Sequence, residues 1–240
     1  MLPVAPSHRL FDYGASDARL SLLPLVPLII SLRALKGIPI MTAQQLSLLP
    51  FYAGWGRYQQ HLVAAIAPLT VAQLALRNTP QTWSIGMYAT HIVANRAWWF
   101  HARMGEGRDE LAALDLWALG VCEADVDPGH PAADLVSGLE KTWQLIEKTL
   151  ARLTPADLEQ VIPPLSQAER VRHAQRVEPA LQPYAQMWVE RERLADEAGA
   201  VRPASSRQRI IWGVLEHDIH HGSEISTILG VHGLPVVELD

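Results

Sequence analysis

The chain has 240 residues, which is enough for one large domain or two small ones. Hydrophobic residues make up 49% of it and charged residues 19%, and this composition excludes an intrinsically disordered chain. The net charge of −5 argues against a nucleic-acid-binding protein, because such a protein needs a basic face for the phosphates. The single cysteine, Cys122, excludes an internal disulfide and a cysteine-based zinc cluster. It suits a reducing compartment, so we expect a cytoplasmic protein.

The first forty residues differ from the rest of the chain. They contain four basic and two acidic side chains, so their net charge is +2, whereas residues 41–240 carry −7. Their apolar stretch at residues 21–32 is too short for a membrane-spanning helix, which needs about 20 apolar residues. Two interpretations stay open. If Met41 is the natural start, residues 1–40 are an extension that is not native or is poorly ordered; otherwise they are an ordered arm on a domain at 41–240.

Beyond Gln44 the apolar residues recur at helical spacing, and the alternation typical of strands is scarce. This pattern predicts four long amphipathic helices. They span about residues 50–67, 82–104, 131–153 and 205–230. Each apolar stripe is wide enough to contact two neighbouring helices. We therefore predict an all-α fold, a four-helix bundle.

A long, proline-rich connection separates the third predicted helix from the fourth. It covers about residues 154–204 and contains six prolines. Within it, a charged segment over about 184–198 predicts one further helix, whose alternating acidic and basic residues indicate a solvated face. The predicted bundle therefore has a long third connection.

Three histidines carry the candidate chemistry. His217 and His221 lie four residues apart on the fourth predicted helix, so they share one face, about 40° apart. Their stripe faces the bundle interior, where each imidazole costs roughly 1–3 kcal/mol unless its nitrogens are satisfied. A shared divalent metal satisfies both, and His91 on the inner stripe of the second helix supplies a third ligand. His220 points about 100° away from His221 and is expected to be a flanking residue.

The surroundings of these histidines leave an alternative open. A histidine on an apolar stripe is also found as an ordinary core residue that is hydrogen-bonded to a carbonyl group. If a metal is bound, the remaining ring N–H groups need acceptors. Glu216, Asp218 and Glu224 are the nearest candidates in the sequence. Other histidines have no partner at ligand spacing and are predicted to be ordinary: His8, His61, His130, His173 and His232.

Two segments resemble a known family. THIVANRAWW at residues 90–99 and EHDIHHGSEIS at 216–226 resemble the DinB-like superfamily, and the resemblance extends over about residues 44–240. It implies a bundle in which three histidines hold a divalent metal ion, zinc, nickel or iron, and these carry over onto His91, His217 and His221. The chain departs from many members after the last histidine, where it has Gly-Ser-Glu in place of Arg-Gly-Gln.

The resemblance also implies a range of functions. Relatives include thiol transferases, so we expect a metal-dependent enzyme of this type that acts on a small molecule, with a low-molecular-weight thiol as co-substrate. Three neutral imidazoles leave the ion its full charge and an open position, which lowers the pKa of a thiol or water there. Cys122 lies in a polar stretch and is not expected to be the nucleophile. We expect a homodimer, without nucleic-acid or membrane partners.

Two other functions remain as alternatives. One is a stress-associated metal-binding bundle without turnover. The other is a zincin-like metallohydrolase, because residues 217–221 differ from His-Glu-x-x-His only in having Asp218 where that motif has its glutamate general base.

Overall fold

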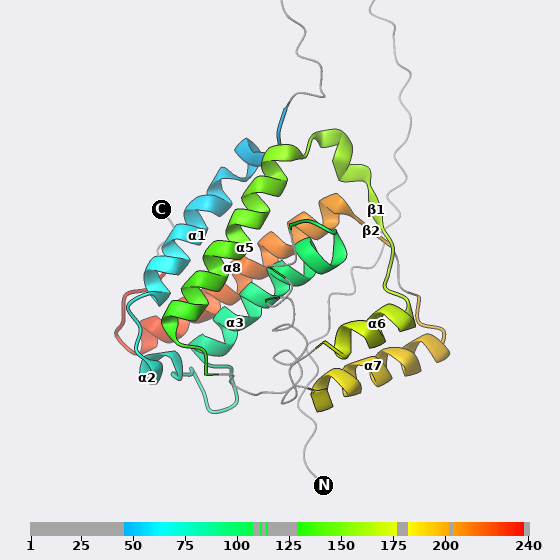
Figure 1. The fold of residues 1–240 in the computed structure, drawn as a ribbon. Helices are drawn as coiled ribbons and strands as arrows, with labels where there is room; N and C mark the ends of the chain where they lie inside the picture. Colours follow the sequence, from blue (N-terminus) through cyan, green and yellow to red (C-terminus); the bar gives the residue numbers. More distant parts are fainter. Residues whose placement is uncertain are drawn as a thin grey trace, which may run out of the picture. The chain divides into compact units, whose positions relative to one another are not determined.

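The structure is a computed structural model that describes residues 46–107, 111, 114, 129–176, 182–201 and 204–237. The predicted extension at residues 1–40 and Cys122 lie outside the described residues. Four long helices form a bundle: α1 (Ala53–Ile66), α3 (Ile85–Arg96), α5 (Ala132–Arg152) and α8 (Arg207–Val231). Helix α3 contacts both α8 and α5, and α5 contacts α1 (Figure 1). The predicted all-α four-helix bundle is confirmed.

Serine caps begin the two helices that carry the candidate histidines. The side chain of Ser84 accepts a hydrogen bond from the backbone N–H of Met87 at the start of α3. The side chain of Ser206 does the same for Arg209 at the start of α8. Both caps satisfy a backbone N–H that the first helical turn leaves without an intrahelical partner. The caps therefore fix where the two histidine-bearing helices start.

The second predicted helix runs without a break, but its winding changes along its length. α3 ends at Arg96, and residues Ala97–Arg103 follow as a π-helix, η3. Ala97 and Phe100 are fully buried in it. A π-helix takes up extra residues per turn, so the 3.6-residue period used for the prediction does not reveal it.

The connection between α5 and α8 is more structured than predicted. It contains a 3-10 helix, η5 (Pro155–Glu159), then α6 (Gln167–Ala174) and α7 (Gln182–Glu197), and α7 is the charged helix expected there. Helix α6 was not predicted, although Ser166 and Glu169 form a capping box that marks its start. Two-residue strands, β1 (Val161–Ile162) and β2 (Ser205–Ser206), pair antiparallel, and they form the one sheet within the described residues.

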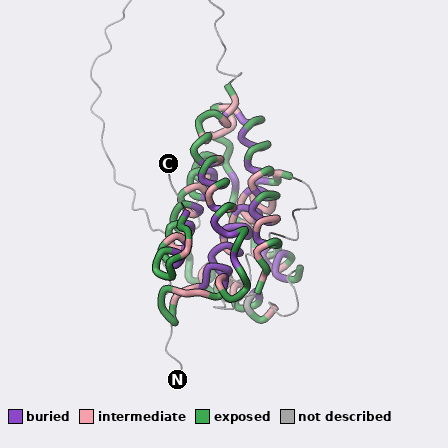
Figure 2. Tube along the Cα trace, turned by 90° about the vertical axis from the view of Figure 1, so that its left-hand side faces the viewer, coloured by how far each residue is buried: buried purple, intermediate pink, exposed green. Residues whose placement is uncertain are grey.

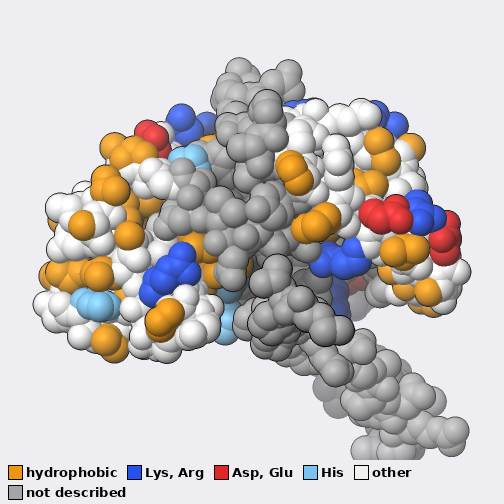
Figure 3. All heavy atoms as spheres, turned by 90° about the horizontal axis from the view of Figure 1, so that it is seen from below, with side chains coloured by type: hydrophobic (Ala, Val, Ile, Leu, Met, Phe, Trp, Pro, Cys, Tyr) orange, Lys and Arg blue, Asp and Glu red, His pale blue; other side chains and the backbone are white. Residues whose placement is uncertain are grey.

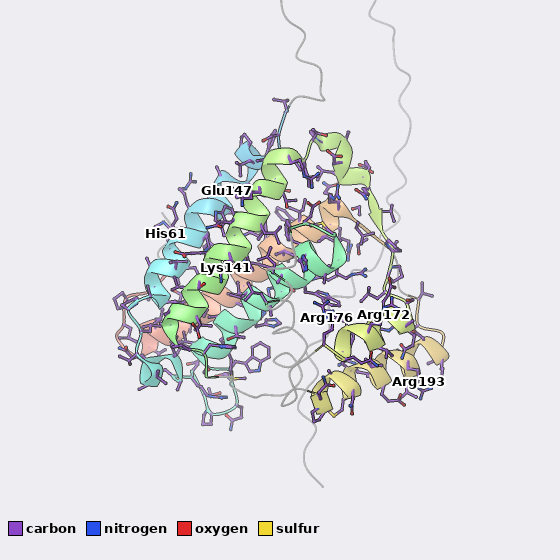
Figure 4. All side chains as sticks on the ribbon, viewed as in Figure 1. His61, Lys141, Glu147, Arg172, Arg176 and Arg193 are labelled. Atoms are coloured by element: carbon purple, nitrogen blue, oxygen red, sulfur yellow. The ribbon has the colours of Figure 1, made fainter. Side chains whose placement is uncertain are left out.

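Short elements complete the described chain. A 3-10 helix, η2 (Leu49–Tyr52), leads into α1, and the single turn of α2 (Val71–Leu74) follows it. Exposed charged side chains, such as Lys141 and Glu147, project from α5 (Figure 4). Seen from below, basic, acidic and hydrophobic side chains are interspersed on the described surface (Figure 3). None of the helices in the described ranges is long and apolar enough to cross a lipid bilayer.

The buried residues line the inner faces of the bundle helices (Figure 2). Most are aliphatic, among them Leu62, Ile92, Leu139 and Ile146. Some polar side chains are buried with them, and two of these, Arg96 and Asp218, are charged residues that are 0% exposed. A buried guanidinium needs an anion and hydrogen-bond acceptors, so Arg96 requires partners in the interior of the bundle.

Tyr58 of α1 lies against the backbone of α8 at Gly222. The Tyr58 hydroxyl on α1 donates a hydrogen bond to the backbone carbonyl of Asp218, at 2.9 Å. A Cβ atom added at Gly222 would lie 1.5 Å from the same hydroxyl oxygen. A side chain at position 222 would therefore displace Tyr58.

This close approach predicts opposite results for two glycines of α8. Gly222→Ala should lower the free energy of unfolding by about 1–3 kcal/mol, because the methyl group displaces a buried side chain. Gly213→Ala is the matched control, because a Cβ there meets no atom within 4 Å. It should leave the stability unchanged or raise it by up to about 1 kcal/mol through helix propensity. Urea denaturation of both variants checks this, and equal effects would contradict it.

Candidate metal centre

The structure brings together the three histidines that the sequence singled out. His91 projects from α3, and His217 and His221 project from α8. One ring nitrogen from each lies within 4.8 Å of the others, and the Nε2 atoms of His91 and His217 are 2.8 Å apart. The rings of His217 and His221 are 4.3 Å apart between centroids. Whether these residues bind a metal remains a prediction.

Two aromatic residues form a wall beside the three imidazoles. The ring of Trp83 meets His91 edge-on at 5.1 Å between centroids and stacks on His221 at 6.1 Å. Tyr88 lies 5.5 Å from His221. Trp83 was not predicted as a site residue, because helical periodicity does not show that a side chain just before the Ser84 N-cap contacts histidines of α3 and α8. The wall restricts the directions from which a small molecule reaches the histidines.

Glu224 fixes the orientation of His221. Its carboxylate accepts a hydrogen bond from His221 Nδ1 at 2.6 Å, so Nε2 is the ring nitrogen left to face the other histidines. Burial opposes ionisation of this carboxyl group, but the hydrogen bond from His221 holds the pKa of Glu224 below its ordinary value. The hydroxyl of Tyr88 also donates to Glu224, and burial together with this carboxylate raises the pKa of Tyr88 to about 12.

The other two predicted acceptors lie elsewhere. Glu216 is exposed, and Asp218 is fully buried in an ion pair with Arg96. Among the described residues, no acceptor contacts Nδ1 of His217. His220 is the flanking residue that was expected, because 64% of its side chain is exposed.

The imidazoles of His91 and His217 are uncharged at neutral pH. Burial and the neighbouring His221 lower the pKa of His91 to about 3. Burial also lowers the pKa of His217 well below its ordinary value, and the adjacent His91 and His221 add to the effect. Neutral imidazole is the form that offers a lone pair to a metal ion. The donor set therefore fits a divalent ion: two neutral imidazoles, and His221, whose ring is oriented by the Glu224 carboxylate.

Beside the histidines, one polar network joins all four bundle helices. Arg96 on α3 donates from Nε to Asp218 Oδ2 on α8 at 2.8 Å, and Trp55 Nε1 on α1 donates to the same oxygen at 2.8 Å. Arg96 Nη1 also donates to Gln59 on α1 at 2.6 Å. Gln59 in turn donates to the carbonyl oxygen of Leu139 on α5 at 3.2 Å.

The network was not foreseen from the sequence. The sequence suggested Asp218 only as an acceptor for the ring N–H of a histidine or as a zincin-like general base, and it suggested no role for Arg96. Burial raises the pKa of Asp218, while Arg96 and Trp55 act against that rise. The sequence does carry one signal, because Arg96 lies within the apolar second helix. An arginine buried there needs a partner of opposite charge.

Comparisons with known proteins agree with this architecture. A family model described as the DinB superfamily matches residues 55–225, a range that includes all three histidines. A solved structure of a DinB-like protein from Bacillus cereus shares 15% sequence identity with the chain. The alignment covers 83% of this chain and 100% of that one, with a TM-score of 0.51, and at this identity it shows the fold alone. Comparison with curated proteins found no match.

The neutral state of His91 predicts a dependence of stability on pH. An unfolded histidine binds a proton near its ordinary pKa of 6.5, whereas folded His91 stays neutral down to a pH of about 3. The unfolded state therefore binds more protons between these values, and the metal-free protein loses stability as the pH falls through them. Between neutral pH and about pH 5 we expect a loss of about 2 kcal/mol from this imidazole.

Urea denaturation in the presence of a chelator measures this loss. His91→Asn should show a shallower fall in unfolding free energy with pH than the wild-type chain, because the unfolded variant has one proton site fewer. Equal slopes for the two proteins would show that His91 is not held neutral by the fold.

Proposed function

Because the chain belongs to the DinB superfamily, and because three imidazoles converge in its bundle, we propose that it binds one divalent metal ion through His91, His217 and His221. The convergence carries the proposal: the residues come from two helices and lie up to 130 positions apart in the sequence, yet their nitrogens lie within 4.8 Å. Imidazole ligands are compatible with zinc, nickel or iron.

Each residue of the site would have a definite part. The three histidines would hold the ion, and Glu224 would keep Nε2 of His221 directed at it. When bound, the ion supplies Lewis acidity, which lowers the pKa of a thiol or water molecule that ligates it. Trp83 and Tyr88 would provide the apolar contact surface for a small molecule next to the histidines.

We further propose a metal-dependent enzyme of the thiol-transferase type, with a low-molecular-weight thiol as co-substrate. The superfamily and the aromatic wall beside the site support this proposal. The alternative, a metal-binding bundle without turnover, is separated from it by thiol binding. With Co²⁺ in the site, a thiol that ligates the ion gives a sulfur-to-cobalt charge-transfer band, whereas an inert bundle gives none.

The zincin-like alternative is disfavoured by the position of Asp218. A general base has to reach the water that it deprotonates. The Asp218 carboxylate instead accepts hydrogen bonds from Arg96 and Trp55 in the interior of the bundle, and its side chain is fully buried.

The proposed ligand set predicts a difference between neighbouring histidines of α8. In chain prepared without a histidine tag, His217→Ala should abolish tight binding of Zn²⁺ or Co²⁺, because it removes one of three ligands. His220→Ala is the matched control and should leave the affinity within about threefold of wild type, since its exposed ring lies outside the set. Isothermal titration and metal analysis of the purified variants measure both. Loss of metal in the His220 variant alone would refute this ligand set.

A further inference from the structure

Polar contacts join α3 and α8 at several points, among them the hydrogen bond from the Tyr88 hydroxyl to Glu224, and two of these contacts lie at or next to His217. The first is the approach of His91 and His217, whose Nε2 atoms are 2.8 Å apart. The second is the ion pair of Arg96 and Asp218, also 2.8 Å long. Arg96 follows His91 by five residues on α3, a rise of about 7.5 Å, and Asp218 follows His217 directly on α8. Two contacts at different heights fix both the slide and the rotation of one helix against the other.

The apolar contacts between these helices do not fix the register in the same way. On α3, buried side chains surround the histidine on nearly every side, among them Ala89, Ile92 and Val93. Apolar attraction has no direction, so an apolar contact selects a register only through the shapes of the side chains that interlock. A hydrogen-bonded ion pair does have a direction and loses its strength over a shift of about 1 Å.

The ion pair is also attached to the rest of the bundle. Trp55 donates to the Asp218 carboxylate, and Tyr58 donates to the Asp218 backbone carbonyl, so α1 holds the same turn of α8 at two points. Gln59 links Arg96 to α5 through the carbonyl oxygen of Leu139. The segment of α8 that begins at His217 therefore cannot shift without breaking bonds to α1 and α3.

Stability alone does not account for such a pair. Each buried ion costs several kcal/mol of desolvation, and apolar residues of similar volume often stabilise a core equally well. Asp218, one member of the pair, follows His217 directly in the sequence. The best-attested use of a buried polar group is to select one register among several.

We propose that Arg96 and Asp218 are positioning residues, which set the register of α8 on α3 and so hold His217 opposite His91 for metal binding. This inference rests on the proposed metal site. It adds that the geometry of the site, and not only the fold, depends on a pair that does not touch the metal.

Co²⁺ binding to the untagged full chain tests the inference, because the visible spectrum of Co²⁺ reports the number and arrangement of its ligands. The main variant combines Arg96→Met with Asp218→Leu, which removes both charges at similar volume. We expect it to stay helical by circular dichroism but to bind Co²⁺ about 10–100-fold more weakly, with an altered spectrum. Thr149→Val is the matched control, because it removes a buried hydroxyl from the same helix, α5, ten residues beyond Leu139. It should keep the wild-type affinity and spectrum.

A second variant decides the matter if the double variant does not fold. Arg96→Lys keeps a positive charge opposite Asp218. The single ammonium group of lysine lacks the planar fork with which the guanidinium donates to both Asp218 and Gln59. It should fold and show the same direction of change in affinity and spectrum. If the double variant folds and keeps the wild-type affinity and spectrum, the positioning role alone is overturned. If the double variant does not fold, wild-type affinity and spectrum in the Arg96→Lys variant overturn it instead. A wild-type chain that binds no Co²⁺ would refute the metal site itself, and this inference with it.

Discussion

The ion pair of Arg96 and Asp218 is the contact on which all four bundle helices converge. Both side chains are fully buried, so each charge depends on the other and on the uncharged partners around them. Those partners come from α1 and α5, through Trp55, Gln59 and the carbonyl oxygen of Leu139. A shift of α8 along α3 would break these hydrogen bonds, so the network favours one register of the helices. The arrangement of the histidines follows from that register.

The chemistry of the site follows from the same burial. Desolvation keeps His91 and His217 neutral, and a neutral imidazole in an apolar interior needs a partner for its lone pair. The Nε2 atoms of His91 and His217 lie 2.8 Å apart, so one of them can donate a hydrogen bond to the other. A divalent ion would satisfy both, together with His221, which Glu224 already orients. Burial of these histidines costs free energy in an apolar core, and the same burial therefore favours their binding to a metal ion.

Much of this could be predicted from the sequence, and the failures have physical reasons. Helical periodicity revealed the four long helices, and the spacing of His217 and His221 placed them on one face, because both signals are local. The partner of Asp218 was not predictable, because Arg96 lies 122 residues away and periodicity does not say which side chains meet across helices. Winding changes such as η3 leave the apolar pattern intact. Helix α6 was missed although its capping box was readable, since its apolar pattern is weak.

The most direct test of the account is the location of the ion itself. Crystals of the untagged chain grown with Zn²⁺, with anomalous diffraction measured at the zinc edge, would place it. The account predicts one ion within about 2.0–2.3 Å of a ring nitrogen from each of His91, His217 and His221. The Arg96–Asp218 pair should remain intact beside it. An ion held by His220 and Glu224 on the exposed side of α8, with His91 turned away, would contradict the account.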